Sequence, residues 1–310
     1  MKIFITGGAG FIGSNLVDRL MSLGHTVSVY DNLSSGKKKF VEQHLNNKKF
    51  RFIQADVLDF KTLNKSLKNG YDIVFHLSSN PDISRSIKQP DLDLYQGIIA
   101  TFNVIESMRQ NNIKKIVFLS GSGIYGDIGD KYASENYGPL IPISMYGASK
   151  LSAEGLISAY SHMFDMKSWI FRLANIVGPR LTHGVIYDFI NKLKNNSNEL
   201  LVLGDGKQSK SYLHVNDTID AILLCLKRSN DNVNIFNVAS NNYITVTEIA
   251  NIVIREMKLK NVKLKYTGGK RGWKGDVPVV RLDTTKINKL NWKPKLNSYE
   301  AVTEAVKENL

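Results

Sequence analysis

The sequence has few of the features that would place it outside ordinary globular proteins. It has one cysteine, Cys225, which excludes an internal disulfide and lies in an apolar run typical of a buried helix. Its purely apolar runs are too short to cross a membrane, and the chain starts in a strand-like segment, 2–6, instead of a signal peptide. It has no internal repeat and no histidine and cysteine cluster with metal-site spacing. We therefore expect a cytoplasmic protein without a metal or a membrane partner.

Acidic residues are also scarce. The 310 residues include 28 Asp and Glu against 41 Lys and Arg, so the formal net charge is +13. The lysines stand singly or in short groups such as 37–39 and 258–260, and no group alternates with aromatic residues as a nucleic-acid stacking surface does. We predict no nucleic-acid partner. The excess charge then reflects a lysine-rich composition or the attraction of a small anionic substrate.

The start of the chain predicts a strand, a glycine-rich turn and a helix. Residues 2–6 are suited to a strand buried on both faces, and an amphipathic segment covers 14–23. Between them, Gly7 permits a tight turn, Gly10 lets a pyrophosphate approach the backbone, and Gly13 lets the helix pack on the strand. The helix N-terminus then offers free N–H groups to phosphates. The predicted dinucleotide-binding residues here are Gly7, Gly10, Phe11, Ile12 and Gly13.

The next predicted strand, 26–30, ends in an acidic residue. Asp31 lies 18 residues after Gly13 (31 − 13), where a dinucleotide fold places the carboxylate that binds the adenosine ribose. This carboxylate would repel a 2′-phosphate, which favours NAD over NADP. The lysines at 37–39 weaken that argument, because cations can bind a phosphate.

Strands and helices continue to alternate, with strands predicted at 50–54, 71–75 and 115–119 and a helix at 92–110. This alternation predicts a doubly wound parallel sheet that binds ligands at the carboxyl ends of its strands. His76 is interpreted as a structural histidine at a strand end. Further predicted cofactor-binding residues follow the strands: Asn32, Ser35, Gly36, Asp56, Val57, Leu77, Ser78 and Ser79.

Tyr146 and Lys150 form the candidate catalytic pair. Their spacing of four places both side chains on one side of a helix, one turn apart. An ammonium there favours phenolate and lowers the pKa of the phenol toward working pH, where it is a usable general base. A Ser/Gly-rich turn, 120–126, precedes the pair and follows a predicted strand end, so it lies on the ligand side of the sheet.

Five motifs in order carry a family resemblance. Segments 6–13, 31–33, 56–57, 124–126 and 146–150 together resemble the extended short-chain dehydrogenase/reductase family. Within it they are most similar to the NAD-dependent nucleotide-sugar epimerases of the UDP-glucose 4-epimerase group. The resemblance covers essentially the whole chain.

The resemblance implies an isomerase with tightly bound NAD. It would convert UDP-glucose and UDP-galactose reversibly at C4 through a transient 4-keto sugar. The implied organisation is a Rossmann domain over 1–174 and a mainly nucleotide-sugar-binding, mixed α/β lobe over 175–310, with some segments returning to the large domain. A homodimer is implied through helices near 92–110 and 149–163.

The resemblance also implies that Tyr146 and Lys150 contact the cofactor, and that the substrate is bound by further residues besides Tyr146 and Ser122. Asn175 would contact the sugar diphosphate, and Val185 would border the uridine. Lys210 stands at a diphosphate position that is commonly arginine. In the closing motif, Arg271 would hold phosphate and Asp276 the uridine ribose.

The hydroxyl partner of Tyr146 departs from the family pattern. Related epimerases carry it four residues before the Tyr-Gly that matches 125–126, and here that position is Gly121. We assign the role to Ser122, with Ser120 as the alternative. Dehydratases of this family carry an Asp-Glu pair, and uronate decarboxylases a glutamate, where this chain has Ser122 and Gly123. Without an acid there, elimination and decarboxylation lose their proton carrier.

Several other functions remain open. The chain could be a UDP-N-acetylhexosamine or UDP-hexuronate 4-epimerase, since Val280 occupies a position where a small side chain leaves room for an N-acetyl group. It could be another NAD-dependent nucleotide-sugar oxidoreductase that releases reduced cofactor. A nucleotide sensor without catalysis is opposed by Tyr146 and Lys150.

Overall fold

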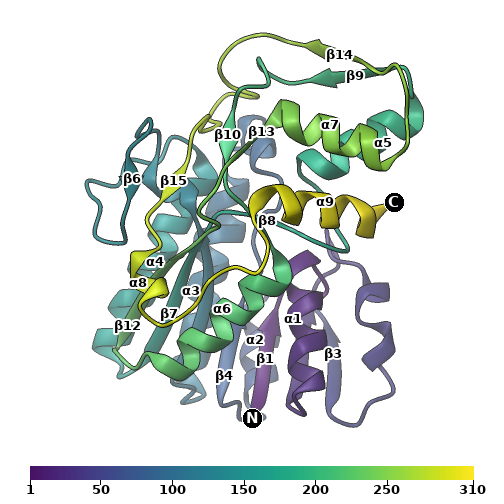
Figure 1. Cartoon of the computed structure of the whole chain (residues 1–310). Coiled ribbons are helices and arrows are strands. Elements are labelled where there is room, and N and C mark those ends of the chain that lie inside the picture. The colour runs from purple at the N-terminus through teal and green to yellow at the C-terminus, as the bar shows by residue number, and fades with distance from the viewer. The chain divides into compact units, whose positions relative to one another are not determined.

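The structure is a computed structural model that describes every residue from Met1 to Leu310 (Figure 1). The chain divides into two compact units. The first comprises Met1–Ser120, Ala148–Arg172 and Cys225–Phe236, and the second comprises Gly121–Gly147, Leu173–Leu224 and Asn237–Leu310. These units differ from the domains predicted at 1–174 and 175–310. The segment that carries Ser122 and Tyr146 belongs to the second unit, and Cys225–Phe236 returns to the first.

The first unit is built on a seven-stranded sheet with the order β12-β7-β5-β4-β1-β2-β3. Strands β1 to β5 pair in parallel wherever they are neighbours. From β1 the chain forms β2 and β3 on one side, and it then returns to form β4 and β5 on the other side of β1. The strand order therefore reverses between β1 and β4, and sheets of this kind bind ligands at such a switch point. The predicted doubly wound fold is confirmed. The strands are β1 (Lys2–Thr6), β2 (Thr26–Asp31), β3 (Phe50–Gln54), β4 (Ile73–His76), β5 (Lys115–Gly121), β7 (Lys167–Leu173) and β12 (Val233–Val238).

Helices cover both faces of the strands in this unit. In Figure 1, α1 lies in front of the strands and α2 and α3 lie behind them. One core joins Phe4 and Phe118 of the sheet to Leu63, Val104 and Ile157 of three helices. Truncating such a residue to alanine typically costs about 2–5 kcal/mol of stability. The helices are α1 (Phe11–Ser22), α2 (Phe60–Leu67), α3 (Ala100–Gln110) and α4 (Met145–Met163), with short turns η1 (Lys38–Phe40), η2 (Glu42–His44), η3 (Ile83–Ile87) and π-helical η4 (Leu94–Ile99).

Two predicted helices differ from the observed ones in a way that bears on the site. The helix predicted to begin at residue 14 begins at Phe11, because Gly10 is its N-cap and Gly13 lies within its first turn. The first part of the helix predicted over 92–110 is the π-helix η4. A Cβ at Gly97 of η4 would lie 2.6 Å from Cβ and Oγ of Ser149, so glycine lets this segment approach α4 closely.

The second unit contains helices and short strand pairs. Helices predicted at 185–194, 215–227 and 246–257 are confirmed within about two residues at their ends. Capping boxes start α7 and α9. The elements are η5 (Ser122–Tyr125), β6 (Tyr132–Ala133), β8 (Asn175–Val177), α5 (Val185–Asn195), β9 (Glu199–Val202), β10 (Ser209–Lys210), β11 (Tyr212–His214), α6 (Val215–Arg228), β13 (Ile244–Thr245), α7 (Val246–Glu256), β14 (Lys263–Tyr266), β15 (Arg281–Leu282), α8 (Thr285–Asn288) and α9 (Ser298–Asn309).

Cys225 and the lengths of the helices were also considered in the sequence. Cys225 is buried in α6 and forms no disulfide, as its apolar surroundings predicted. None of the helices is long and apolar enough to span a membrane.

Candidate active site

The glycine loop of the first unit fits a dinucleotide pyrophosphate. Gly10 caps α1 without a side chain, so the N–H groups of Phe11 and Ile12 in the first turn have no side-chain cap and face a potential anion. A Cβ at Gly13 would lie 2.2 Å from the carbonyl oxygen of Gly7, which excludes any larger residue there. The loop and the start of α1 therefore have the close packing and the free helix N-terminus that the predicted pyrophosphate cradle requires.

Residues predicted to hold the adenosine lie together beside this loop. The Asp31 carboxylate accepts hydrogen bonds from the Ala9 N–H at 2.9 Å and the Leu33 N–H at 2.8 Å. Burial raises the pKa of Asp31, and these two N–H groups oppose the shift. A Cβ at Gly36 would lie 3.0 Å from Asp31 Oδ1, so a glycine permits the chain to pass here.

The neighbouring adenine-side residues are connected directly. Asn32 Nδ2 donates to Asp56 Oδ2 at 2.8 Å. The carbonyl of Val57 accepts from Asn103 Nδ2 at 3.0 Å, which fixes the turn after β3. Ser35 is exposed. The turns after β2 and β3, where adenosine-binding residues are predicted, are thus held together in the first unit.

The turn after β4 packs against the glycine loop. The Leu77 N–H donates to the Thr6 carbonyl at 3.1 Å, and a Cβ on Gly7 would lie 2.8 Å from the Ser78 nitrogen. Ser79 follows in the same turn. The predicted residues 77–79 therefore lie against the predicted phosphate loop.

His76 anchors this turn through a directed chain of hydrogen bonds. The Thr101 hydroxyl donates to the Gly97 carbonyl at 2.5 Å, so it accepts from His76 Nε2, 3.0 Å away. His76 Nδ1 then accepts from the Thr6 hydroxyl at 2.7 Å. Burial lowers the pKa of His76 to about 3, and the charge of Lys150 adds to the shift. The imidazole is neutral and its contacts suit the structural role expected for it.

This buried histidine predicts acid sensitivity. Between pH 6.5 and 3 the unfolded chain binds the His76 proton and the folded chain does not, so stability is complete above pH 6.5 and falls as the pH approaches 3. We expect this group to remove roughly 2 kcal/mol of unfolding free energy between pH 7 and 5. Urea titrations of His76→Gln should show that much less pH dependence. The control His162→Gln, at an exposed position of α4, should keep the wild-type slope. An unchanged slope in His76→Gln would contradict the assignment.

Lys150 is buried at the end of β5. Its Nζ donates to the Leu119 carbonyl at 2.8 Å and lies 4.9 Å from the centre of the Phe118 ring. Burial lowers the pKa of Lys150 to about 8, and the nearby Asp93 and Glu154 carboxylates oppose the shift. The side chain therefore still carries its charge at pH 7.

A buried ion pair joins Glu154, one turn further along α4, to Arg172 of β7. Arg172 Nη2 lies 2.8 Å from Glu154 Oε2, and both side chains are nearly inaccessible. This pair was not predicted from the sequence. Glu154 follows Lys150 at the same i,i+4 spacing that marked Tyr146 and Lys150, and this spacing was the available signal.

In the second unit, Tyr146 faces the Ser/Gly turn. A Cβ at Gly121 would lie 3.7 Å from Tyr146 Oη, and one at Gly123 would lie 3.9 Å from Tyr146 Cδ1. A Cβ at Gly147 would lie 2.5 Å from the Gly123 carbonyl oxygen. The glycines let the turn approach the start of α4, with the absent side chain of Gly121 directed at the phenol.

The two serines beside Gly121 have different surroundings. Ser120 lies in β5, 3% exposed, and its Oγ has no hydrogen-bond partner. Ser122 begins η5 and lines a pocket. The pocket favours Ser122 as the hydroxyl that a substrate can reach.

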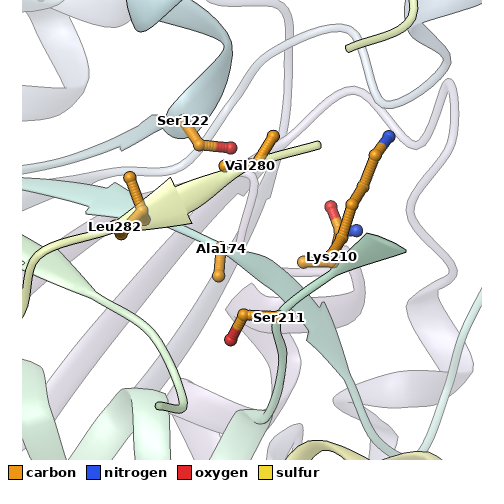
Figure 2. A pocket seen from close by; sticks show the side chains of 7 residues that line it. Ser122, Ala174, Lys210, Ser211, Val280 and Leu282 are labelled. Carbon is orange, nitrogen blue, oxygen red and sulfur yellow. The ribbon is translucent and has the colours of Figure 1, made fainter. Parts of the chain in front are cut away.

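This pocket gathers residues from four segments of the second unit and opens to solvent, with about 210 Å³ of empty space including the solvent at its mouth (Figure 2). Figure 2 shows the Ser122 hydroxyl pointing toward Val280, while the Lys210 side chain extends away from Ala174 and Leu282. Four lining residues were singled out from the sequence and three were missed. The lining residues are Ser122, Ala174, Asn175, Lys210, Ser211, Val280 and Leu282.

Two more of the predicted substrate residues, Arg271 and Asp276, form a charged group with Lys210. Lys210 Nζ lies 2.6 Å from Asp276 Oδ1, and Arg271 Nη1 donates to the Asp276 carbonyl at 2.6 Å. Arg271 Nη2 also pairs with Asp127 Oδ2 at 2.6 Å, a partner that the sequence analysis missed. Val185 starts α5 and is not one of the pocket-lining residues.

A buried asparagine joins the pocket's supporting segments. Asn237 Oδ1 accepts from the Tyr125 hydroxyl at 2.8 Å, at the end of η5. Its Nδ2 donates to the carbonyls of Ala133 at 2.8 Å and Asp283 at 3.0 Å. The side-chain amide of Asn237 thus makes three hydrogen bonds inside the protein, and these link η5 to β6 and to the end of β15.

Comparisons with known proteins agree with this geometry. Residues 3–239 match the family described as the NAD dependent epimerase/dehydratase family, which confirms the predicted cofactor, NAD. A putative UDP-glucose 4-epimerase from Methanocaldococcus jannaschii is 32% identical over 98% of this chain and 97% of its own length.

Solved structures give the same result. A crystal structure of a UDP-galactose 4-epimerase is 38% identical, covers 99% of this chain and 98% of its own, and has a TM-score of 0.89. The UDP-glucose 4-epimerase of Thermus thermophilus, solved with NAD, is 29% identical with the same coverages and TM-score. Similar proteins also include UDP-sugar decarboxylases and a UDP-N-acetylglucosamine 4-epimerase, so several reactions occur among them.

Proposed function

Because the chain belongs to the NAD dependent epimerase/dehydratase family, we propose that it is a UDP-hexose 4-epimerase that interconverts UDP-glucose and UDP-galactose. The observation that carries the proposal is the pocket of the second unit. It combines Ser122 with Asn175 and Lys210, two residues expected at a sugar diphosphate. The relatives named as epimerases of these sugars support the same reaction.

The residues present fit the cofactor. The cradle of Gly7, Gly10 and Gly13 would hold its pyrophosphate, and Asp31 its adenosine ribose. Lys150 would donate to the nicotinamide ribose. Bound NAD supplies the hydride acceptor and then the donor for C4 of the sugar, through a 4-keto intermediate, so no net oxidation occurs.

The chain's own residues move and hold the proton. Tyr146 takes the proton of the C4 hydroxyl as general base and returns it after the sugar has turned over. Lys150, one helical turn away and charged below about pH 8, favours the phenolate form of Tyr146. Ser122 donates a hydrogen bond to the C4 oxygen.

Charges around the pocket would hold the diphosphate. Lys210 and Arg271 are the cations, and Asp276 would accept from the uridine ribose. In the structure Lys210 and Arg271 contact Asp276 and Asp127, so the substrate has to compete with these contacts. A lysine binds phosphate as a point charge and not bidentately.

The proposal is tested by incubating the purified protein with UDP-galactose and following UDP-glucose by proton NMR. We expect the same equilibrium mixture from either sugar, without added reductant. Steady growth of absorbance at 340 nm with excess NAD would indicate a net oxidoreductase. Release of CO₂ from UDP-glucuronate would indicate a decarboxylase. Absence of conversion in the presence of NAD would contradict the proposal.

UDP-N-acetylhexosamines are the second candidate substrates. Val280 lines the pocket, and valine leaves more room there than an aromatic residue would. The same NMR experiment with UDP-N-acetylglucosamine measures whether that room is used. Conversion of the acetylated sugar alone would reassign the substrate without changing the reaction.

We also propose that the protein is a homodimer built on α3 and α4. Phe102 on α3 is 41% exposed, and its ring lies edge-on to that of Tyr160 on α4, with centroids 6.5 Å apart. Large exposed apolar groups are typical of interfaces. Sedimentation should give twice the chain mass of 34.8 kDa. Phe102→Glu should shift the protein toward the monomer, whereas Tyr299→Glu, an exposed position on α9, should not.

A further inference from the structure

One wall of the pocket is formed by strand β15 and the residue before it, and Arg281 lies between the two lining residues of this wall. Val280 and Leu282 face the pocket. Successive side chains of a strand point to opposite sides, so Arg281 is directed away from it. Its side chain is only 16% exposed, which is low for an arginine outside the pocket.

Arg281 is held by contacts in two directions. The guanidinium carbon lies 3.8 Å from the centre of the Tyr243 ring, within the range of a strong cation–π contact. Nη1 donates to the Ser209 carbonyl at 3.3 Å. The exposed Asp130 is 3.9 Å away and adds little.

The contact with Ser209 joins two walls of the pocket. Ser209 directly precedes Lys210, which lines the pocket from β10. The same segment is tied to the approach to β15, because the Ser209 N–H donates to the Pro278 carbonyl at 2.9 Å. Arg281 therefore bridges the wall of Val280 and Leu282 to the wall of Lys210.

We propose that Arg281, stacked on Tyr243, is a positioning residue that fixes the spacing of these two walls and thereby the affinity and selectivity for the nucleotide sugar. This inference rests on the proposed function. A planar guanidinium can stack and donate at once, which a lysine cannot do. Without the Arg281 side chain, the backbone hydrogen bond from Ser209 to Pro278 remains as the tie between the two walls, so their spacing and the position of Lys210 beside the pocket are held less firmly.

The first test compares steady-state kinetics of wild type, Arg281→Ala, Arg281→Lys and Tyr243→Leu with UDP-galactose. We expect Arg281→Ala to raise KM about 10-fold, with kcat changed less than about threefold, since the substrate is held less well while Tyr146 is untouched. Selectivity between UDP-galactose and UDP-N-acetylgalactosamine should fall by a similar factor. Arg281→Lys should restore only part of the loss. The double variant Arg281→Ala/Tyr243→Leu should have a KM no higher than that of either single variant, because both substitutions remove the same stacking contact.

Arg255→Ala is the matched control. Arg255 lies over the Tyr299 ring at 5.6 Å, joining α7 to α9, and lines no part of the pocket. It should leave KM unchanged. Melting temperatures within a few degrees of wild type would show that Arg281→Ala is folded.

Calorimetric binding of UDP separates this inference from the proposed function. If wild type binds UDP but converts no UDP-hexose, the epimerase proposal fails, and weaker UDP binding by Arg281→Ala still supports the positioning role. If Arg281→Ala matches wild type in KM, selectivity and UDP affinity, the positioning role is overturned while the epimerase stands. If wild type neither binds nor converts these compounds, both are overturned.

Discussion

The Tyr146→Phe variant is expected to lose about 10³-fold in kcat for the interconversion of UDP-galactose and UDP-glucose. A positioned general base contributes about 10²- to 10⁴-fold, and phenylalanine keeps the ring while removing the only group that can take the C4 proton. The start of α4 should be undisturbed, because phenylalanine fills the same space beside Gly121 and Gly123 as the tyrosine ring. Turnover is measured by NMR under saturating sugar.

The same preparations should be assayed for bound NAD, released by denaturation and quantified. Tyr146→Phe should retain the cofactor, since the glycine cradle and Asp31 lie in other segments of the chain. Tyr160→Phe is the matched control, because Tyr160 lies on the same helix and its hydroxyl bonds Glu106 at 3.0 Å. A Tyr146→Phe enzyme that keeps its full kcat would remove the tyrosine from the mechanism and favour a nucleotide-binding protein whose chemistry lies elsewhere.

The parts of the fold that could be predicted are those whose signal is local. The strand over 2–6 matches β1, because a buried parallel strand is a short apolar run. The strand over 50–54 matches β3, an edge strand with Phe50 buried and Arg51 and Gln54 exposed. Gly7, Gly10 and Gly13 could be assigned separate roles because each one meets a close backbone approach that follows from strand–turn–helix geometry.

Other parts could not be predicted because their signal is nonlocal or too short. Strands β6 and β15 contain two residues each, which is fewer than an alternating pattern needs. Leu282 was missed for this reason, although it follows Val280 by two. The structural role of Asn237 could not be predicted, since its side chain bonds to residues more than 40 positions away in the sequence.

The choice between Ser120 and Ser122 depended on where a strand ends. Residues two apart on one strand face the same side, so a continued β5 would have made the two serines equivalent. Instead β5 ends at Gly121 and η5 begins at Ser122. Ser122 then turns into the pocket, and Ser120 stays buried in the strand.

Because Ser122 lies in the pocket, its substitution is expected to have the second large effect on kcat. Ser122→Ala should lower kcat about 10²-fold with little change in KM, because it removes a hydroxyl aimed at charge that develops on the C4 oxygen. Ser120→Ala should stay within a few-fold of wild type. The opposite ranking, with Ser120→Ala the more damaging, would contradict the assignment made from the pocket.

Gly121 offers a stronger test of the same idea. Its backbone is extended, with φ −155°, so any residue can adopt it, and a Cβ there would lie 3.7 Å from Tyr146 Oη in ordinary contact. Gly121→Ser therefore places a hydroxyl beside the phenol from the neighbouring position. In the Ser122→Ala background it should recover at least about 10-fold in kcat, whereas Gly121→Ala, which adds the same Cβ without the hydroxyl, should recover nothing. Equal behaviour of the two would mean that the serine acts through packing and not as a hydrogen-bond donor.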